Sequence, residues 1–263
     1  MFKKNSSLKP KQADLLLNLN KKTSFTESIK SIRTNLAFSE VDKEMQVILI
    51  TSAQPGDGKS FISANLALAY KDEGKKVLLI DADLRRGRQN QIFRVVNSAN
   101  KGYSNLILNY QDSNSSKNKK GVDFDIASYI VKAKQGIDLI PNGPTPPNPI
   151  ELLASNNNEK LLKQLREMYD IIIIDCTPVL GISDAIVMTK YSDANILVVS
   201  SKKTKLELVA RVDKLFKQSH ASLTGVVINK VDVAEGGYYG YYANSYYGES
   251  EEWKIYIITF CQG

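Results

Sequence analysis

One stretch of the sequence, AQPGDGKS at residues 53–60, carries the residue types that bind a chain of phosphates. Glycines let backbone N–H groups approach an anion closely, a lysine places a cation on the terminal phosphate oxygens, and a serine hydroxyl binds magnesium. An apolar run precedes the stretch and a helix-like segment follows it, which is the context that such a loop needs. The sequence therefore predicts a P-loop, although Ala53 replaces its usual first glycine. The predicted nucleotide-binding residues in this loop are Pro55, Gly56, Asp57, Gly58, Lys59 and Ser60.

Acidic residues stand at the ends of two further apolar runs. Asp175 ends the run 171–175, and Asp81 and Asp83 lie at and just beyond the end of the run at residues 77–81. Ligands of an open parallel sheet bind at the carboxyl ends of its strands, so we expect these carboxylates beside the P-loop. A single aspartate at such a place could be a helix N-cap, but three of them indicate a magnesium-nucleotide site. The predicted metal-binding residues are Ser60, Asp83 and Asp175.

Short apolar runs alternate with helix-like segments along the chain. The runs are nearly continuous and rich in β-branched residues, which is typical of strands buried on both faces of a parallel sheet. They lie at residues 47–51, 77–81, 137–140, 171–175, 196–200 and 226–229. The helix-like segments lie at residues 24–38, 60–73, 150–168, 184–190 and 205–219. This alternation predicts an α/β fold with a doubly wound, mostly parallel sheet, the fold class of P-loop NTPases.

Composition divides the chain into three parts. We expect a basic arm at residues 1–23, a P-loop domain at 24–234 and a tyrosine-rich tail at 235–263, with a surface loop at 111–121. Residues 1–35 hold eight basic and two acidic side chains and so carry a charge of +6. Such a segment could bind an anionic lipid surface, or it could be a solvated segment that precedes the domain. Because no aromatic residues are interleaved with these basic ones, nucleic acid is not an expected partner.

The bulk composition excludes several classes of protein. A chain of 263 residues with 43% hydrophobic residues suits one α/β domain with short appendages. No apolar run reaches the length of about 18 residues that a membrane-spanning helix needs. The two cysteines, Cys176 and Cys261, are far apart and suggest neither a disulfide framework nor a zinc site, so we expect a cytoplasmic protein. The single histidine excludes chemistry that needs two.

Several motifs together resemble those of the bacterial tyrosine kinases of the capsule and exopolysaccharide type, over about residues 24–250. DADLR at residues 81–85 resembles the additional Walker A′ motif of that family, and residues 141–155 resemble its proline-rich segment. Three charged residues resemble its N-terminal oligomerisation helix, namely Glu27, Lys30 and Arg33. Paired tyrosines resemble its C-terminal cluster, namely Tyr238, Tyr239, Tyr241, Tyr242, Tyr246 and Tyr247.

The resemblance implies a kinase that uses ATP and Mg²⁺ to phosphorylate tyrosines, chiefly those in the tail of a neighbouring copy within a ring-like homo-oligomer. Lys59 and Arg85 would supply positive charge, and Asp81 would contact the tyrosine hydroxyl as base or orienter. Asp83 would be mainly metal-related, although it and Asp81 could exchange these roles. Asn229 follows a strand and is a candidate for contact with the nucleotide base.

Without a membrane-spanning segment, the chain resembles the split form of the family. In that form a separate membrane adaptor, of the polysaccharide co-polymerase type, recruits a cytoplasmic kinase to the inner face of the membrane. Three features depart from the family pattern. Lys30 replaces an arginine, and residues 253–263 are apolar rather than charged. Asp175 takes the place of the Walker B aspartate, and the residue after it is Cys176 where the family usually has a threonine.

Two other functions share these motifs. A partition-type P-loop ATPase has the same fold, but such proteins carry a signature lysine at the position of Gln54 and lack a tyrosine tail. A regulatory scaffold whose nucleotide only controls assembly would need the same binding residues. The appearance of phosphotyrosine with ATP would distinguish a kinase from a scaffold.

Overall fold

The computed structural model describes residues 23–39, 45–95, 101–110, 124–231 and 254–259. Its centre is an eight-stranded sheet in the order β3-β4-β2-β5-β1-β6-β7-β8. The six inner strands run parallel, and β3 and β8 pair antiparallel at the two edges. The strands are β1 (Val47–Ser52), β2 (Val77–Asp81), β3 (Val131–Lys132), β4 (Asp138–Ile140), β5 (Ile171–Asp175), β6 (Ala194–Ser200), β7 (Gly225–Val231) and β8 (Lys254–Thr259).

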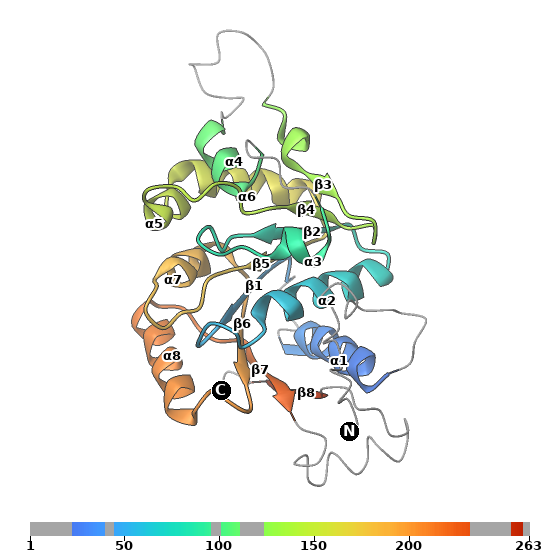
Figure 1. The fold of residues 1–263 in the computed structure, drawn as a ribbon, viewed down its shortest axis with the longest axis vertical. Coiled ribbons are helices and arrows are strands. Elements are labelled where there is room, and N and C mark those ends of the chain that lie inside the picture. The colour runs from blue at the N-terminus through green and yellow to red at the C-terminus, as the bar shows by residue number, and fades with distance from the viewer. Residues whose placement is uncertain (1–22, 40–44, 96–100, 111–123, 232–253, 260–263) are drawn as a thin grey trace, which may run out of the picture.

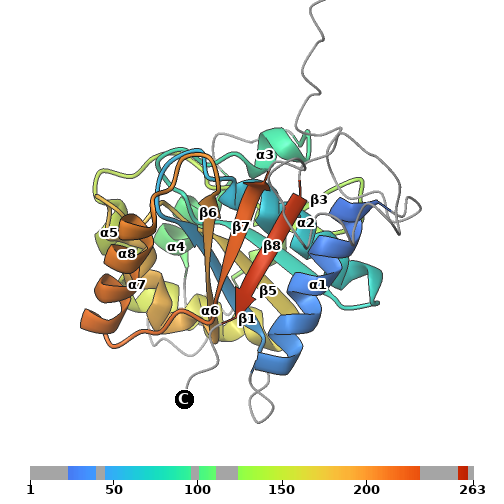
Figure 2. The same ribbon diagram turned by 90° about the horizontal axis from the view of Figure 1, so that it is seen from below.

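Helices cover both faces of this sheet (Figures 1 and 2). One face carries α1 (Ser24–Ser39), α2 (Lys59–Asp72) and α3 (Gln89–Ile92), which pack with Ile48 and Ile50 of β1. Val47 and Leu49 point to the opposite face, because successive side chains of a strand alternate. The helices of that face are α4 (Tyr103–Asn109), α5 (Pro149–Leu153), α6 (Asn156–Met168), α7 (Asp184–Met188) and α8 (Leu206–Gln218). The predicted doubly wound, mostly parallel α/β fold is thus confirmed.

Two of the predicted helices are interrupted in the structure. The segment 150–168 divides into α5 and α6 at Ser155, whose hydroxyl accepts a hydrogen bond from the backbone N–H of Asn158 at 3.3 Å. A serine in this position is an N-cap and begins a new helix rather than continuing the old one. The segment 184–190 is α7 followed by a 3-10 turn at Thr189–Tyr191. The expected surface loop at 111–121 lies outside the described residues.

The edge strand β8 comes from a part of the chain that the sequence assigned to the tail. It pairs with β7 from Gly225 opposite Thr259 to Val231 opposite Lys254. Residues 254–259, whose apolar character departs from the family pattern, therefore form an edge strand of the sheet. The expected basic arm, up to residue 22, and the tyrosine cluster both lie outside the described residues. Among the described segments, no helix combines the length and apolar character needed to cross a bilayer.

Candidate active site

The P-loop connects β1 to α2, and its backbone requires glycine. Gly56 and Gly58 have φ angles of 88° and 109°, in the left-handed region that favours glycine. A Cβ atom on Gly58 would lie only 2.0 Å from Nδ2 of Asn229, so a side chain has no room there. Asn229 Nδ2 also donates a hydrogen bond to the carbonyl of Asp57 at 2.8 Å, and Lys230 Nζ donates to the carbonyl of Gly56. The end of β7 therefore supports the P-loop through the amide of Asn229, and the contact of Asn229 with a nucleotide base stays a prediction.

Asp57 orders the same loop from inside. Its side chain is buried, with 1% of the residue exposed. Its Oδ2 accepts a hydrogen bond from the backbone N–H of Gln54 at 2.9 Å, and its Oδ1 accepts one from Thr204 Oγ1 at 2.9 Å. Asp57 is one of the predicted nucleotide-binding residues. In the structure its carboxylate connects the P-loop to the segment after β6.

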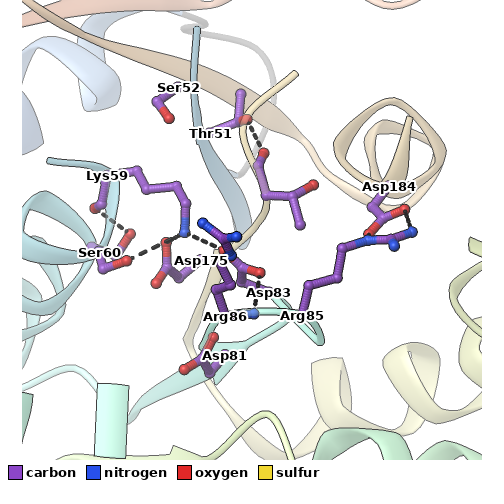
Figure 3. Close-up of polar contacts among 12 residues, drawn as sticks. Thr51, Ser52, Lys59, Ser60, Asp81, Asp83, Arg85, Arg86, Asp175 and Asp184 are labelled. Carbon is purple, nitrogen blue, oxygen red and sulfur yellow. Dashed lines mark hydrogen bonds and ion pairs between the residues drawn. The ribbon is translucent and has the colours of Figure 1, made fainter. Parts of the chain in front are cut away.

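Lys59 joins the P-loop to both acidic motifs (Figure 3). Its Nζ lies 2.9 Å from Asp83 Oδ2 and 3.3 Å from Asp175 Oδ1, and it donates to Ser60 Oγ at 3.3 Å. Burial lowers the pKa of Lys59, but the carboxylates of Asp175, Asp83 and Asp81 together raise it by more than burial lowers it, so the net shift is upward. The lysine thus keeps its positive charge at the point where the sequence predicted a phosphate site.

Asp81, like Asp175, is a completely buried carboxylate. The residue is 0% exposed, and its Oδ2 accepts a hydrogen bond from the backbone N–H of Gln89 at 2.9 Å. Its Oδ1 is buried and has no hydrogen-bond partner within the described residues. Burial, and then the negative charge of Asp175, raise the pKa of Asp81 to about 8. Asp81 can therefore hold or release a proton near neutral pH, as a general base must.

Arg85 is oriented by a buried carboxylate at the start of α7. Its Nε donates to Asp184 Oδ2 at 2.9 Å and its second terminal nitrogen donates to Asp184 Oδ1 at 3.2 Å (Figure 3). This two-point contact fixes the plane of the guanidinium. The next residue, Arg86, donates its backbone N–H to Asp83 Oδ1 at 2.9 Å. The DADLR motif thus orients one of its own carboxylates and directs its arginine towards α7.

The donor set at this edge of the sheet fits a magnesium ion. Asp83 and Asp175 offer carboxylate oxygens, Ser60 offers a hydroxyl, and the buried Oδ1 of Asp81 is an unused acceptor close by. Mg²⁺ takes hard oxygen ligands and is commonly held by one or two carboxylates together with phosphates and water. No group of three or more acidic, histidine or cysteine side chains forms a metal cage in the part of the chain that the structure describes. An ion at this site would therefore depend on the nucleotide for further ligands.

The predicted oligomerisation residues lie on α1, away from this site, and contact their own chain. Arg33 donates to the carbonyl of Ala69 at 3.0 Å and forms an ion pair with Glu73 at 2.5 Å, both through its terminal nitrogens. Lys30 Nζ lies 3.3 Å from Glu27 Oε1 one turn away on the same helix. Arg33 thereby connects α1 to α2.

Two residues of the site were not identified from the sequence. Thr204 lies just beyond β6, so the strand-end argument that identified the aspartates could have included it. Gln89 lies eight residues after Asp81, and its side chain is fully buried against Asp175 and Ser60. No motif or periodicity in the sequence marks it.

Comparison with known proteins adds independent findings. Residues 45–225 match the AAA domain family. Tyrosine-protein kinase YwqD of Bacillus subtilis (strain 168) is 36% identical over 217 residues, which is 82% of this chain and 86% of that protein. The putative tyrosine-protein kinase CapB of Staphylococcus aureus is 33% identical over 249 residues, 95% of this chain and all 100% of that one. The crystal structure of the chimerical protein CapA2B2 superposes with a TM-score of 0.70 at 34% identity, covering 80% of this chain and 86% of that one.

Proposed function

Because this chain belongs to the family of bacterial tyrosine-protein kinases, we propose that it transfers phosphate from ATP to tyrosines of its own C-terminal segment. The observation that carries the proposal is the contact of Lys59 with Asp83 and Asp175, which brings the P-loop cation and both acidic motifs to one point. The substrate is the cluster of six tyrosines at residues 238–247, offered by a neighbouring copy. The composition of the segment supports this choice of substrate, because the tyrosines lie among glycines and acidic residues.

In the proposed mechanism, each residue of the site has its own role in phosphoryl transfer. Lys59 exchanges its carboxylate partners for the terminal phosphate oxygens when nucleotide binds, and Arg85, oriented by Asp184, adds positive charge nearby. Asp81 takes the proton of the attacking tyrosine hydroxyl, and its raised pKa makes its ionised form a stronger base. Ser60, Asp83 and Asp175 would hold a Mg²⁺ ion, which would neutralise charge on the phosphates. Asp83 is the alternative base, because it lies in the same contact with Lys59.

We further propose that the kinase assembles into a ring-like homo-oligomer and regulates the synthesis of capsular or extracellular polysaccharide. A membrane adaptor would recruit it to the cytoplasmic face of the membrane and activate it there. The support is its relationship to CapB and to a putative tyrosine-protein kinase in the cps region of Klebsiella pneumoniae, which is 31% identical over 205 residues. Oligomer contacts through Glu27, Lys30 and Arg33 are part of this proposal.

Mass spectrometry of the purified protein after incubation with Mg-ATP and the cytoplasmic segment of the adaptor tests the function. We expect phosphate on the tyrosines of residues 238–247. The variant Lys59→Met should abolish it, because the phosphates lose their cation, whereas Lys75→Met, which changes an exposed lysine, should not. Phosphotyrosine at the normal rate in Lys59→Met would contradict the P-loop assignment. ATP hydrolysis without any phosphotyrosine would instead favour the partition-type ATPase.

A further inference from the structure

Gln89, the first residue of α3, touches all three motifs of the site. Its side-chain Nε2 donates to Asp175 Oδ2 at 2.8 Å and to the carbonyl of Ser60 at 2.9 Å. Its backbone N–H donates to Asp81 Oδ2 at 2.9 Å. Figure 1 shows α3 beside α2, the helix that the P-loop opens. One fully buried residue therefore contacts the P-loop segment, the Walker A′ motif and the Walker B aspartate.

The direction of the Gln89 amide follows from its neighbours. A carboxylate and a carbonyl can only accept hydrogen bonds, so the atom between them must be the nitrogen, and both of its hydrogens are used. The oxygen Oε1 then lies on the other side, where it is buried and has no partner within the described residues. Leaving a buried acceptor unpaired disfavours folding, so packing alone gives no reason for a glutamine here.

These contacts decide which oxygen each aspartate presents. Asp81 and Asp175 are register partners on the neighbouring parallel strands β2 and β5, so their carboxylates lie side by side. Gln89 occupies Oδ2 of both. The Oδ1 of Asp175 is left for Lys59, and the Oδ1 of Asp81 is left without a partner. Two adjacent carboxyl groups are thus held in fixed orientations by one neutral residue.

We propose that Gln89 is a positioning residue for phosphoryl transfer, whose side-chain amide fixes the carboxylate of Asp175 so that it presents its Oδ1 to the reacting groups. The proposal rests on the proposed function, since it concerns the same magnesium-nucleotide site. Gln89 acts through Asp175 and need not touch the substrate itself. Residues that orient metal-binding groups in this way commonly change metal affinity or activity by about 10–100-fold when replaced.

Two substitutions in the full-length chain test this role. Gln89→Met keeps the length of the side chain but removes the Nε2 donor to Asp175 and Ser60, and Gln89→Glu replaces that donor with a carboxylate. Both variants keep the backbone N–H that contacts Asp81. Gln91 lies on the same short helix and is exposed, so Gln91→Met and Gln91→Glu are matched controls for side-chain volume and charge. Thermal unfolding of all four variants shows whether the fold survives each change.

We expect kcat to fall about tenfold or more in Gln89→Met, with the KM for ATP changed by less than about threefold, because positioning acts on the transfer step. Gln89→Glu should lose more, since its added charge repels Asp175. The Mg²⁺ concentration needed for half-maximal binding of a fluorescent ADP analogue should rise several-fold in both variants. Binding of the same analogue in EDTA should stay at the parent value.

Parent values of kcat and of the Mg²⁺ midpoint in a folded Gln89→Met variant would overturn the proposal. So would equal losses in the Gln91 variants. If Gln89→Met failed to fold, a folded Gln89→Glu variant with an unchanged Mg²⁺ midpoint would overturn it as well. The binding readout does not depend on phosphotyrosine, so a parent protein that binds Mg-nucleotide without phosphorylating itself would contradict the proposed function alone.

Discussion

Replacing Asp81 by asparagine should change how the stability of the nucleotide-free protein depends on pH. Asp81 is fully buried, and burial together with the charge of Asp175 raises its pKa to about 8, whereas an unfolded chain has a value of about 3.9. Between these two values the folded state holds one proton more than the unfolded state. Stability from this group is therefore complete below about pH 4, decreases as the pH rises, and is lost above about pH 8.

The slope in that range is about 1.4 kcal/mol per pH unit and flattens as the pH approaches 8. From pH 6 to pH 8 the parent protein should lose about 2 kcal/mol of unfolding free energy relative to Asp81→Asn. Asparagine still offers an oxygen to the backbone N–H of Gln89, but it does not titrate. Groups that do not interact with Asp81 contribute equally to the two proteins, so their contributions cancel when the proteins are compared at each pH.

Urea unfolding at pH 6, 7 and 8, without nucleotide or Mg²⁺, measures this difference. Asp72→Asn is a suitable control, because it makes the same chemical change at an exposed carboxylate outside the site. Curves for the parent and Asp81→Asn that run parallel from pH 6 to pH 8 would refute the reasoning. They would mean that Asp81 is ionised throughout and that Lys59 compensates its burial.

Two further predictions concern the assembly. Arg33→Ala should lower the unfolding free energy by about 1 kcal/mol, because it removes the hydrogen bond to Ala69 and the ion pair with Glu73. Glu73→Gln removes only the ion pair and should therefore cause only part of this loss. If α1 also forms the contact between copies, light scattering should show a smaller particle for Arg33→Ala but not for Glu73→Gln. An unchanged mass in both variants would contradict a role of α1 in the oligomer contact. Changing all six tyrosines of residues 238–247 to phenylalanine should keep the oligomer intact in Mg-ATP, because full phosphorylation adds a charge of roughly −9 to −12. Disassembly of that variant as readily as the parent would show that nucleotide binding alone is the switch.

The parts of the site that follow from strand ends could be predicted from the sequence. A buried parallel strand has a recognisable composition, and the residue at its carboxyl end must lie at one edge of the sheet. For this reason Lys59, Asp83 and Asp175 meet as expected. The same rule also placed Asp81 correctly beside them, but it carried no information on hydrogen-bond partners.

Features that depend on how elements pack could not be predicted in this way. The partner of Arg33 is set by the packing of α1 on α2, which no local pattern encodes. Gln89 acts through contacts to residues far away in the sequence, and a glutamine in a short loop is usually exposed. The apolar run at 254–259 is far from β7 in the sequence, and no short hairpin connects the two, so its place at the sheet edge depends on tertiary pairing.

The pairing of β8 with β7 brings together the two points of the sheet between which the tyrosine cluster lies in the sequence. Val231 and Lys254 are register partners next to the P-loop contact of Lys230. Whatever its conformation, a chain of about 22 residues held at one place by both ends cannot put its midpoint farther than roughly 35–40 Å from that place. In the proposed transfer between neighbouring copies, the active site of one copy must lie within this radius of the β7–β8 pair of the other, so the length of the segment sets an upper limit on the spacing of the two subunits.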